Sequence, residues 1–187
     1  MDAIMFALVA VALANADGRA GSFLSELLTV RGDRRAVVGI AFGAFAANAA
    51  VAAAAGAVAS RTIGQGLIQL LVAFAMLSAA TSLVWRRRAV PAAGTLADTA
   101  PAALAFRMLL NQFGDRSHFL IGALAATSGA GQWAAAGGAI GWLLALLPFL
   151  AFGSGLAAQR PARIICYTSA LILTLWGLRT AMTAFGL

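Results

Sequence analysis

Two short polar stretches carry most of the residues that could do chemistry inside this chain. NADGRAGSF spans residues 15–23, NQFGDRSHF spans residues 111–119, and both lie next to long apolar runs. Each contains an Asp, a Gly and an Arg within three consecutive residues. Charged side chains in apolar surroundings are costly unless they are paired or used, so the two stretches form the candidate site.

The polar side chains of the two stretches could bind a cation or a proton. Hard divalent cations prefer oxygen ligands, and an aspartate can take up and release a proton when its surroundings change from wet to dry. Asp17 and Asp115 are the candidate metal ligands, and no cofactor is expected apart from a transported divalent cation. The candidate ion- and proton-binding residues are Asn15, Asp17, Gln112, Asp115, Ser117 and His118.

The glycines and arginines of the same stretches have predicted supporting roles. Gly18 and Gly114 would let the helices loosen, which frees backbone carbonyls for a cation. Arg19 and Arg116 are the charge partners of the aspartates. In a second interpretation, Asp17 with Arg19 and Asp115 with Arg116, or each with its opposite number in the other half, only neutralise one another and fix the register of the helices.

Composition places the chain in the membrane. Of 187 residues, 62% are hydrophobic and 10% charged, far from the balance of soluble domains. The net charge of +7 comes from arginines around apolar segments, so the expected partner is the lipid bilayer and not nucleic acid. A single cysteine, Cys166, excludes an internal disulfide.

The apolar runs predict an all-α membrane protein with six transmembrane helices in one domain, residues 1–187. Each half would contain three helices: repeat one covers about 1–85, a linker about 86–100, and repeat two about 101–187. The predicted segments are about 4–30, 36–59, 67–85, 101–127, 133–157 and 162–185.

Weak similarity between the halves predicts an inverted repeat. Gly39 and Gly43 match Gly137 and Gly141 at a displacement of 98 residues. Because three crossings are an odd number, the second half would insert upside down, as in many secondary transporters. Both glycine pairs have the spacing that allows close helix packing.

The arginines predict the orientation, because positive residues accumulate on the cytoplasmic side. With both termini outside, Arg61 lies in an outer connection and eight arginines lie inside. Arg without Lys and abundant Ala favour a bacterial cytoplasmic membrane. The inner arginines are Arg31, Arg34, Arg35, Arg86, Arg87, Arg88, Arg160 and Arg163.

QFGDRS, residues 112–117, resembles the Glu-x-Gly-Asp-(Lys/Arg)-(Ser/Thr) signature of the transmembrane-protein-165 family of cation/proton antiporters. The resemblance implies two such motifs, six helices and exchange of calcium or manganese for protons. Here Gln112 and Asn15 stand where the family has Glu, and the first motif has Asp17 and Gly18 in swapped order and Ala20 in place of the hydroxyl residue. The two amides remove negative charge from the implied ion site.

These observations predict a secondary transporter that exports a cation in exchange for protons. The expected cation is divalent, Mn²⁺ or Ca²⁺, and its site would lie at the midplane, shared by the first and fourth segments. A non-transporting membrane protein that acts as an assembly partner or regulatory subunit is the alternative. Transport of another small solute, such as an amino acid, and homo-oligomer formation stay open. We do not expect an enzyme, although Ser154 and His118 would be the residues of an intramembrane hydrolase.

Overall fold

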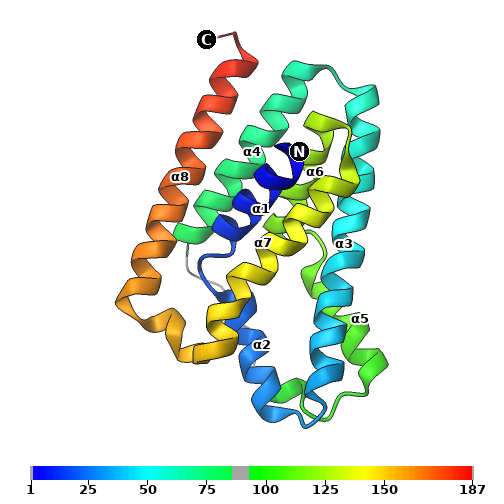
Figure 1. The fold of residues 1–187 in the computed structure, drawn as a ribbon, viewed down its shortest axis with the longest axis vertical. Coiled ribbons are helices and arrows are strands. Elements are labelled where there is room, and N and C mark those ends of the chain that lie inside the picture. Colours follow the sequence, from blue (N-terminus) through cyan, green and yellow to red (C-terminus); the bar gives the residue numbers. More distant parts are fainter. Residues whose placement is uncertain (1, 86–92, 187) are drawn as a thin grey trace.

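The computed structural model describes residues 2–85 and 93–186, and the regular structure in these ranges is entirely helical (Figure 1). The predicted cytoplasmic arginines Arg86, Arg87 and Arg88 lie outside the described residues. Two short 3-10 helices, η1 (Ala93–Leu96) and η2 (Ser154–Ala158), accompany the α-helices. The α-helices are α1 (Asp2–Ala14), α2 (Arg19–Val30), α3 (Arg34–Thr62), α4 (Gln65–Val84), α5 (Pro101–Gln112), α6 (Arg116–Ser128), α7 (Gly131–Phe152) and α8 (Arg160–Ala184).

Four helices of the described chain are long and apolar enough to cross a membrane: α3, α4, α7 and α8. The pair α1 and α2 adds a fifth span if it is counted as one segment bent by 70°. The predicted segment 101–127 is divided between α5 and α6 and is not among these spans. The protein is thus an all-α, multi-pass membrane protein with four to five candidate spans.

Helices of the first half of the chain, α1 to α4, pack against helices of the second half, α5 to α8. In Figure 1, α1 lies along α7, α4 lies along α8, and α3 runs beside α6 and α5. α1 and α6 contact each other in the middle of the bundle and bury small and branched apolar residues, among them Ala10, Val11 and Ile121. Each half is therefore completed by helices of the other.

One of the two glycine pairs makes the predicted close helix contact. A Cβ atom added at Gly137 or Gly141 would overlap the backbone carbonyl oxygen of Ile4 or Leu8 on α1. At Gly39 and Gly43 of α3, in contrast, a Cβ atom would meet no described atom within 4 Å. The prediction of close packing is therefore confirmed for α7 and wrong for α3 within the described chain.

Gly137→Ala and Gly141→Ala are expected to lower the free energy of unfolding by about 1–3 kcal/mol each, because the rigid α1 backbone must move away. The matched variants Gly39→Ala and Gly43→Ala should stay within about 0.5 kcal/mol of the parent protein, as surface substitutions usually do. Unfolding of the four variants in mixed micelles, followed by tryptophan fluorescence, measures both effects. Equal destabilisation by both pairs would contradict the packing described here.

Arg31 ties the corner between α2 and α3 to the segment that joins the two halves. Its side chain is only 7% exposed, and it makes two 2.7 Å contacts to the Asp33 carboxylate. The same guanidinium donates to the backbone carbonyls of Leu96, Ala97 and Thr99, at 2.9, 3.2 and 2.7 Å. One arginine thus provides hydrogen-bond donors for three backbone carbonyl groups at the end of η1 and in the turn that follows it.

This corner predicts a pH dependence. The hydrogen bonds from Arg31 hold the pKa of the Asp33 carboxyl below its ordinary value. A carboxyl with a lowered pKa in the folded state contributes stability above its unfolded pKa, and this contribution is lost as the pH falls through the folded pKa. Asp33→Asn should therefore be less stable than the parent protein at pH 7, and the difference should vanish in acid. Denaturation curves between pH 7 and pH 3 test this, with Asp2→Asn as an exposed control.

Candidate functional site

The first polar stretch forms a break between α1 and α2. α1 ends at Ala14, and the backbone N–H of Gly18 donates to the carbonyl of Asn15 at 3.0 Å, closing a tight turn. Gly18 has φ +68°, in the left-handed region that glycine adopts without strain, and α2 begins at Arg19. The two helices meet at 70°. The Asp-Gly pair of the sequence is therefore the point where the helix is interrupted.

The second polar stretch forms the corresponding break between α5 and α6. α5 ends at Gln112, and the N–H of Asp115 donates to the carbonyl of Gln112 at 3.1 Å. Gly114 has φ +71°, and α6 begins at Arg116. Both turns are closed by a backbone hydrogen bond between residues three apart, and the two bonds lie 97 residues apart in the chain, which equates Asn15 with Gln112 and Arg19 with Arg116. The swapped Asp-Gly order moves the left-handed glycine by one position and gives α6 an Asp at its N-cap.

The breaks of the two halves are joined by a buried ion pair. Arg116 Nη2 lies 2.5 Å from Asp17 Oδ1, with side chains that are 12% and 7% exposed. Arg116 also donates to Ser82 Oγ of α4 at 2.9 Å. Arg19, the first residue of α2 and two positions after Asp17, makes a longer 3.4 Å contact to Asp17 Oδ2. Asp17 is thus shared between two arginines, and the closer one comes from the other half.

A second polar chain links the same two breaks. The side-chain amide of Asn15 donates to Ser117 Oγ at 2.9 Å, and Ser117 Oγ donates to Asp115 Oδ2 at 3.1 Å. Asn15 and Ser117 are both buried. The Asp115 carboxylate has no ion pair among residues 2–85 and 93–186. Asp115 is therefore the acid of the site whose charge is not balanced by a bound arginine.

Gln112 and His118 lie at the edge of this group and contact α3. Gln112 Nε2 lies 3.5 Å from the carbonyl oxygen of Ala41, and His118 Nε2 lies 3.3 Å from that of Phe45. The other polar atoms of these side chains, Gln112 Oε1 and His118 Nδ1, are buried without a hydrogen-bond partner in the part of the chain that is described. All six predicted ion- and proton-binding residues thus belong to one region of the bundle.

A cavity of about 850 Å³ opens at this region. It receives charged side chains from both breaks, namely Arg19, Asp115 and Arg116, together with the amides of Asn15 and Gln112. Its apolar wall includes Phe45 and Trp142, whose rings stack at a centroid distance of 4.3 Å. The two sequence stretches therefore line a single space.

Several residues of the region carry no signal in the sequence. Ser82 looks like one more hydroxyl in an apolar helix, yet it accepts a hydrogen bond from Arg116. Phe45 and Trp142 belong to apolar runs, and only the packing of α3 against α7 places them at the cavity. Phe149 of α7 lies directly over Gly18 and Gly21. Long-range packing, not local pattern, selects these side chains.

The left-handed glycines of the two breaks provide a matched comparison. An alanine at either Gly18 or Gly114 would strain the backbone by about 1–2 kcal/mol. At Gly18 the new Cβ would also overlap the ring of Phe149, whereas at Gly114 nothing lies within 4 Å. Gly18→Ala should therefore cost about 1–3 kcal/mol more than Gly114→Ala. Unfolding in micelles measures the difference, and Phe149→Leu should reduce it; equal costs for the two variants would rule out the overlap.

A divalent metal would find few protein ligands here. No group of three or more His, Cys, Asp and Glu side chains suited to a metal occurs among the described residues. The candidate ligands Asp17 and Asp115 bring two negative charges, and Arg19 and Arg116 bring two positive ones. Since Ca²⁺ binding depends strongly on the number of charged oxygen ligands, the arginines would have to move before such an ion binds tightly.

The hydrolase pair does not come together through a hydrogen bond that the structure describes. The imidazole of His118 contacts Phe45, and the Ser154 carbonyl lies 3.5 Å from the hydroxyl of Ser22. Ser154 belongs to η2, beyond the end of α7.

No protein-family model matches the chain, and no curated protein or solved structure is significantly similar to it.

Proposed function

We propose that this protein is a secondary transporter that moves a small charged substrate across the membrane in exchange for protons. The observation that carries the proposal is the meeting of two helix breaks, one from each half of the chain, at one cavity lined by Asp115, Arg19 and Arg116. Interrupted helices with exposed backbone ends and charged side chains inside an apolar bundle are typical of transporter binding sites.

The proposal includes six crossings arranged as two inverted repeats. α1 with α2 corresponds to α5 with α6, α3 to α7, and α4 to α8. The matching turns at Asn15–Gly18 and Gln112–Asp115 support this correspondence. α5 with α6 would be the sixth crossing, with the α6 half at the centre of the bundle next to α1.

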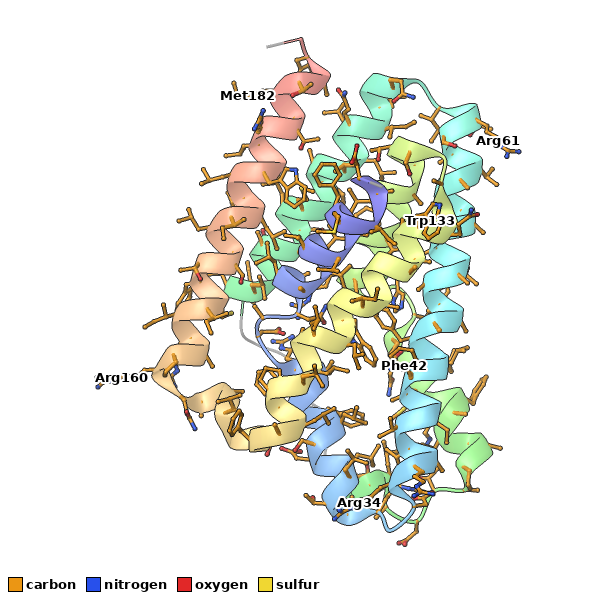
Figure 2. All side chains as sticks on the ribbon, viewed as in Figure 1. Arg34, Phe42, Arg61, Trp133, Arg160 and Met182 are labelled. Carbon is orange, nitrogen blue, oxygen red and sulfur yellow. The ribbon has the colours of Figure 1, made fainter. Side chains whose placement is uncertain are left out.

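An orientation with both termini outside follows from the same proposal. Figure 2 shows Arg34 and Arg160 toward the lower part of the view and Arg61 near its upper end, where α8 also ends. If the lower part faces the cytoplasm, the arginine distribution obeys the positive-inside rule. We place the protein in a bacterial cytoplasmic membrane on this basis and on its composition.

A divalent cation, Mn²⁺ or Ca²⁺, is the first substrate to test, because the Gln112–Ser117 stretch resembles the transmembrane-protein-165 family. Asp115 would be the proton-carrying acid, since it lines the cavity without a paired arginine. Export would then couple release of the substrate to protonation of this carboxylate.

Reconstituted protein in liposomes tests the proposal. An imposed pH gradient should drive flux of at least one substrate from a panel of Mn²⁺, Ca²⁺, Mg²⁺, Na⁺ and amino acids, and collapse of the gradient by a protonophore should stop it. Protein-free liposomes give the background. Flux that ignores the pH gradient, or no flux for any member of the panel, would reject proton-coupled transport.

A non-transporting role is the second candidate, and one contact favours it. The buried pair between Asp17 and Arg116 fastens the two halves together, as expected for a static membrane scaffold. Such a protein would show no flux in the liposome assay and would act by binding another membrane protein.

A further inference from the structure

The size of the cavity fits a small organic molecule. At about 850 Å³ it lies within the range of about 300–1,000 Å³ that is typical of small-molecule sites. A dehydrated inorganic ion is instead held by six to eight close oxygen ligands, roughly, in a cage of its own size. A bare cation would fill only a small part of this cavity and would leave its aromatic wall without a ligand to contact.

The cavity contains one available charge of each sign. Asp17 is neutralised by Arg116 at 2.5 Å, so Arg19, at 3.4 Å from Asp17 and with a side chain 32% exposed, has capacity for another anion. Asp115 has no paired cation in the described chain and accepts one hydrogen bond from Ser117. A ligand that carries one negative and one positive group would satisfy both residues without adding net charge to the apolar bundle.

The helix ends at the two breaks have the same dual character. α2 and α6 begin at Arg19 and Arg116, so their N-terminal dipole ends favour an anionic group. α1 and α5 end at Ala14 and Gln112, and their last carbonyl groups favour a cationic one. Gln112 Oε1 is, in addition, a buried acceptor without a described partner.

The remaining wall is apolar and aromatic. Phe23, Phe45, Phe113 and Trp142 line the cavity together with Leu24 and Met108. These side chains could cover a hydrocarbon or aromatic substituent and would contribute nothing to a hydrated metal ion.

We propose that the substrate is a zwitterion with an apolar substituent, an α-amino acid in chemical class, whose carboxylate is bound by Arg19 and whose ammonium group is bound by Asp115. This inference rests on the proposed transporter and names its substrate class in place of a divalent cation. Arg116 and Asp17 are the fixed pair that holds the two breaks around the site.

Binding to the purified full-length protein in detergent micelles, measured by calorimetry, tests the substrate class. The probes are L-phenylalanine, 3-phenylpropionate, which lacks the ammonium group, phenethylamine, which lacks the carboxylate, and MnCl₂. L-phenylalanine should bind, and each one-charge analogue should bind about tenfold to a hundredfold more weakly, because one charged hydrogen-bonded contact is lost.

Two arginine variants locate the site. Arg19→Gln should reduce the affinity for the amino acid by about tenfold to a hundredfold and leave that for phenethylamine unchanged. Arg107→Gln is the control, because Arg107 is exposed on α5 and is not part of the cavity wall. A fluorescence unfolding curve for each variant shows that it is folded.

Binding of MnCl₂ without amino-acid binding, equal binding of 3-phenylpropionate and L-phenylalanine, or unchanged affinity in folded Arg19→Gln would each overturn the inference. The outcomes separate it from the transporter proposal. Amino-acid binding without proton-driven flux rejects the transporter and keeps the site, whereas proton-driven cation flux without amino-acid binding keeps the transporter and rejects the substrate class.

Discussion

Replacement of Arg116 by Gln is expected to lower the free energy of unfolding by about 3–5 kcal/mol, because it leaves a buried carboxylate without its closest cation. Asp17 is 7% exposed, and its second contact, to Arg19 at 3.4 Å, is too long to replace the 2.5 Å pair. The substitution also removes the hydrogen bond to Ser82. The expected loss is therefore a large part of the stability of an ordinary single domain, about 5–15 kcal/mol.

A double-mutant cycle separates the pair from the rest of the site. Asp17→Asn, Arg116→Gln and the double variant should be non-additive, with the double variant more stable than the sum of the single losses predicts. Unfolding in mixed micelles gives the three values, and Arg107→Gln controls for removal of an exposed arginine. Additive losses below about 1 kcal/mol each would mean that the pair behaves like a solvent-exposed one.

The arrangement along the chain was largely predictable, because it depends on local pattern. Each predicted apolar segment contains one helix or one broken pair, and the breaks occur at Asp17-Gly18 and at Gly114-Asp115. Glycine tolerates the left-handed backbone that a turn between two helices requires, so Gly18 and Gly114 mark these points in the sequence itself. The prediction of six crossings has a different outcome, because four to five helical spans of the described chain are long and apolar enough to cross a membrane.

Pairing between segments was not predictable, because it depends on which faces meet. The sequence leaves open whether Asp17 pairs with Arg19 or with an arginine of the other half, and the structure shows that Arg116 makes the closer contact from 99 residues away. The two glycine pairs look alike in sequence, but only Gly137 and Gly141 face another backbone. Small differences in helix placement between the halves decide such contacts, and a single sequence does not encode them as a local signal.

Asp115→Asn is expected to abolish proton-driven flux in liposomes while leaving the protein folded. Asp115 is the N-cap residue of α6, but its side chain makes no capping hydrogen bond, and asparagine is accepted equally well at this position, so the start of α6 should be retained. The amide oxygen of the new side chain can still accept the hydrogen bond from Ser117. The negative charge and the capacity to bind and release a proton are both lost, so the flux measured under a pH gradient should fall to that of protein-free liposomes.

Glu26→Gln is the matched control, because Glu26 is an exposed acid on α2 and does not line the cavity. It should transport like the parent protein when equal amounts of protein are reconstituted.

Undiminished proton-driven flux in Asp115→Asn would assign the proton to another group, and the carboxylate that remains inside the spans at the two breaks is Asp17. Protonation of Asp17 would release Arg116 and so separate the two halves, which makes coupling through Asp17 distinguishable by its sensitivity to Arg116→Gln. Coupling through Asp115 predicts instead that the Asp17–Arg116 pair stays closed throughout transport.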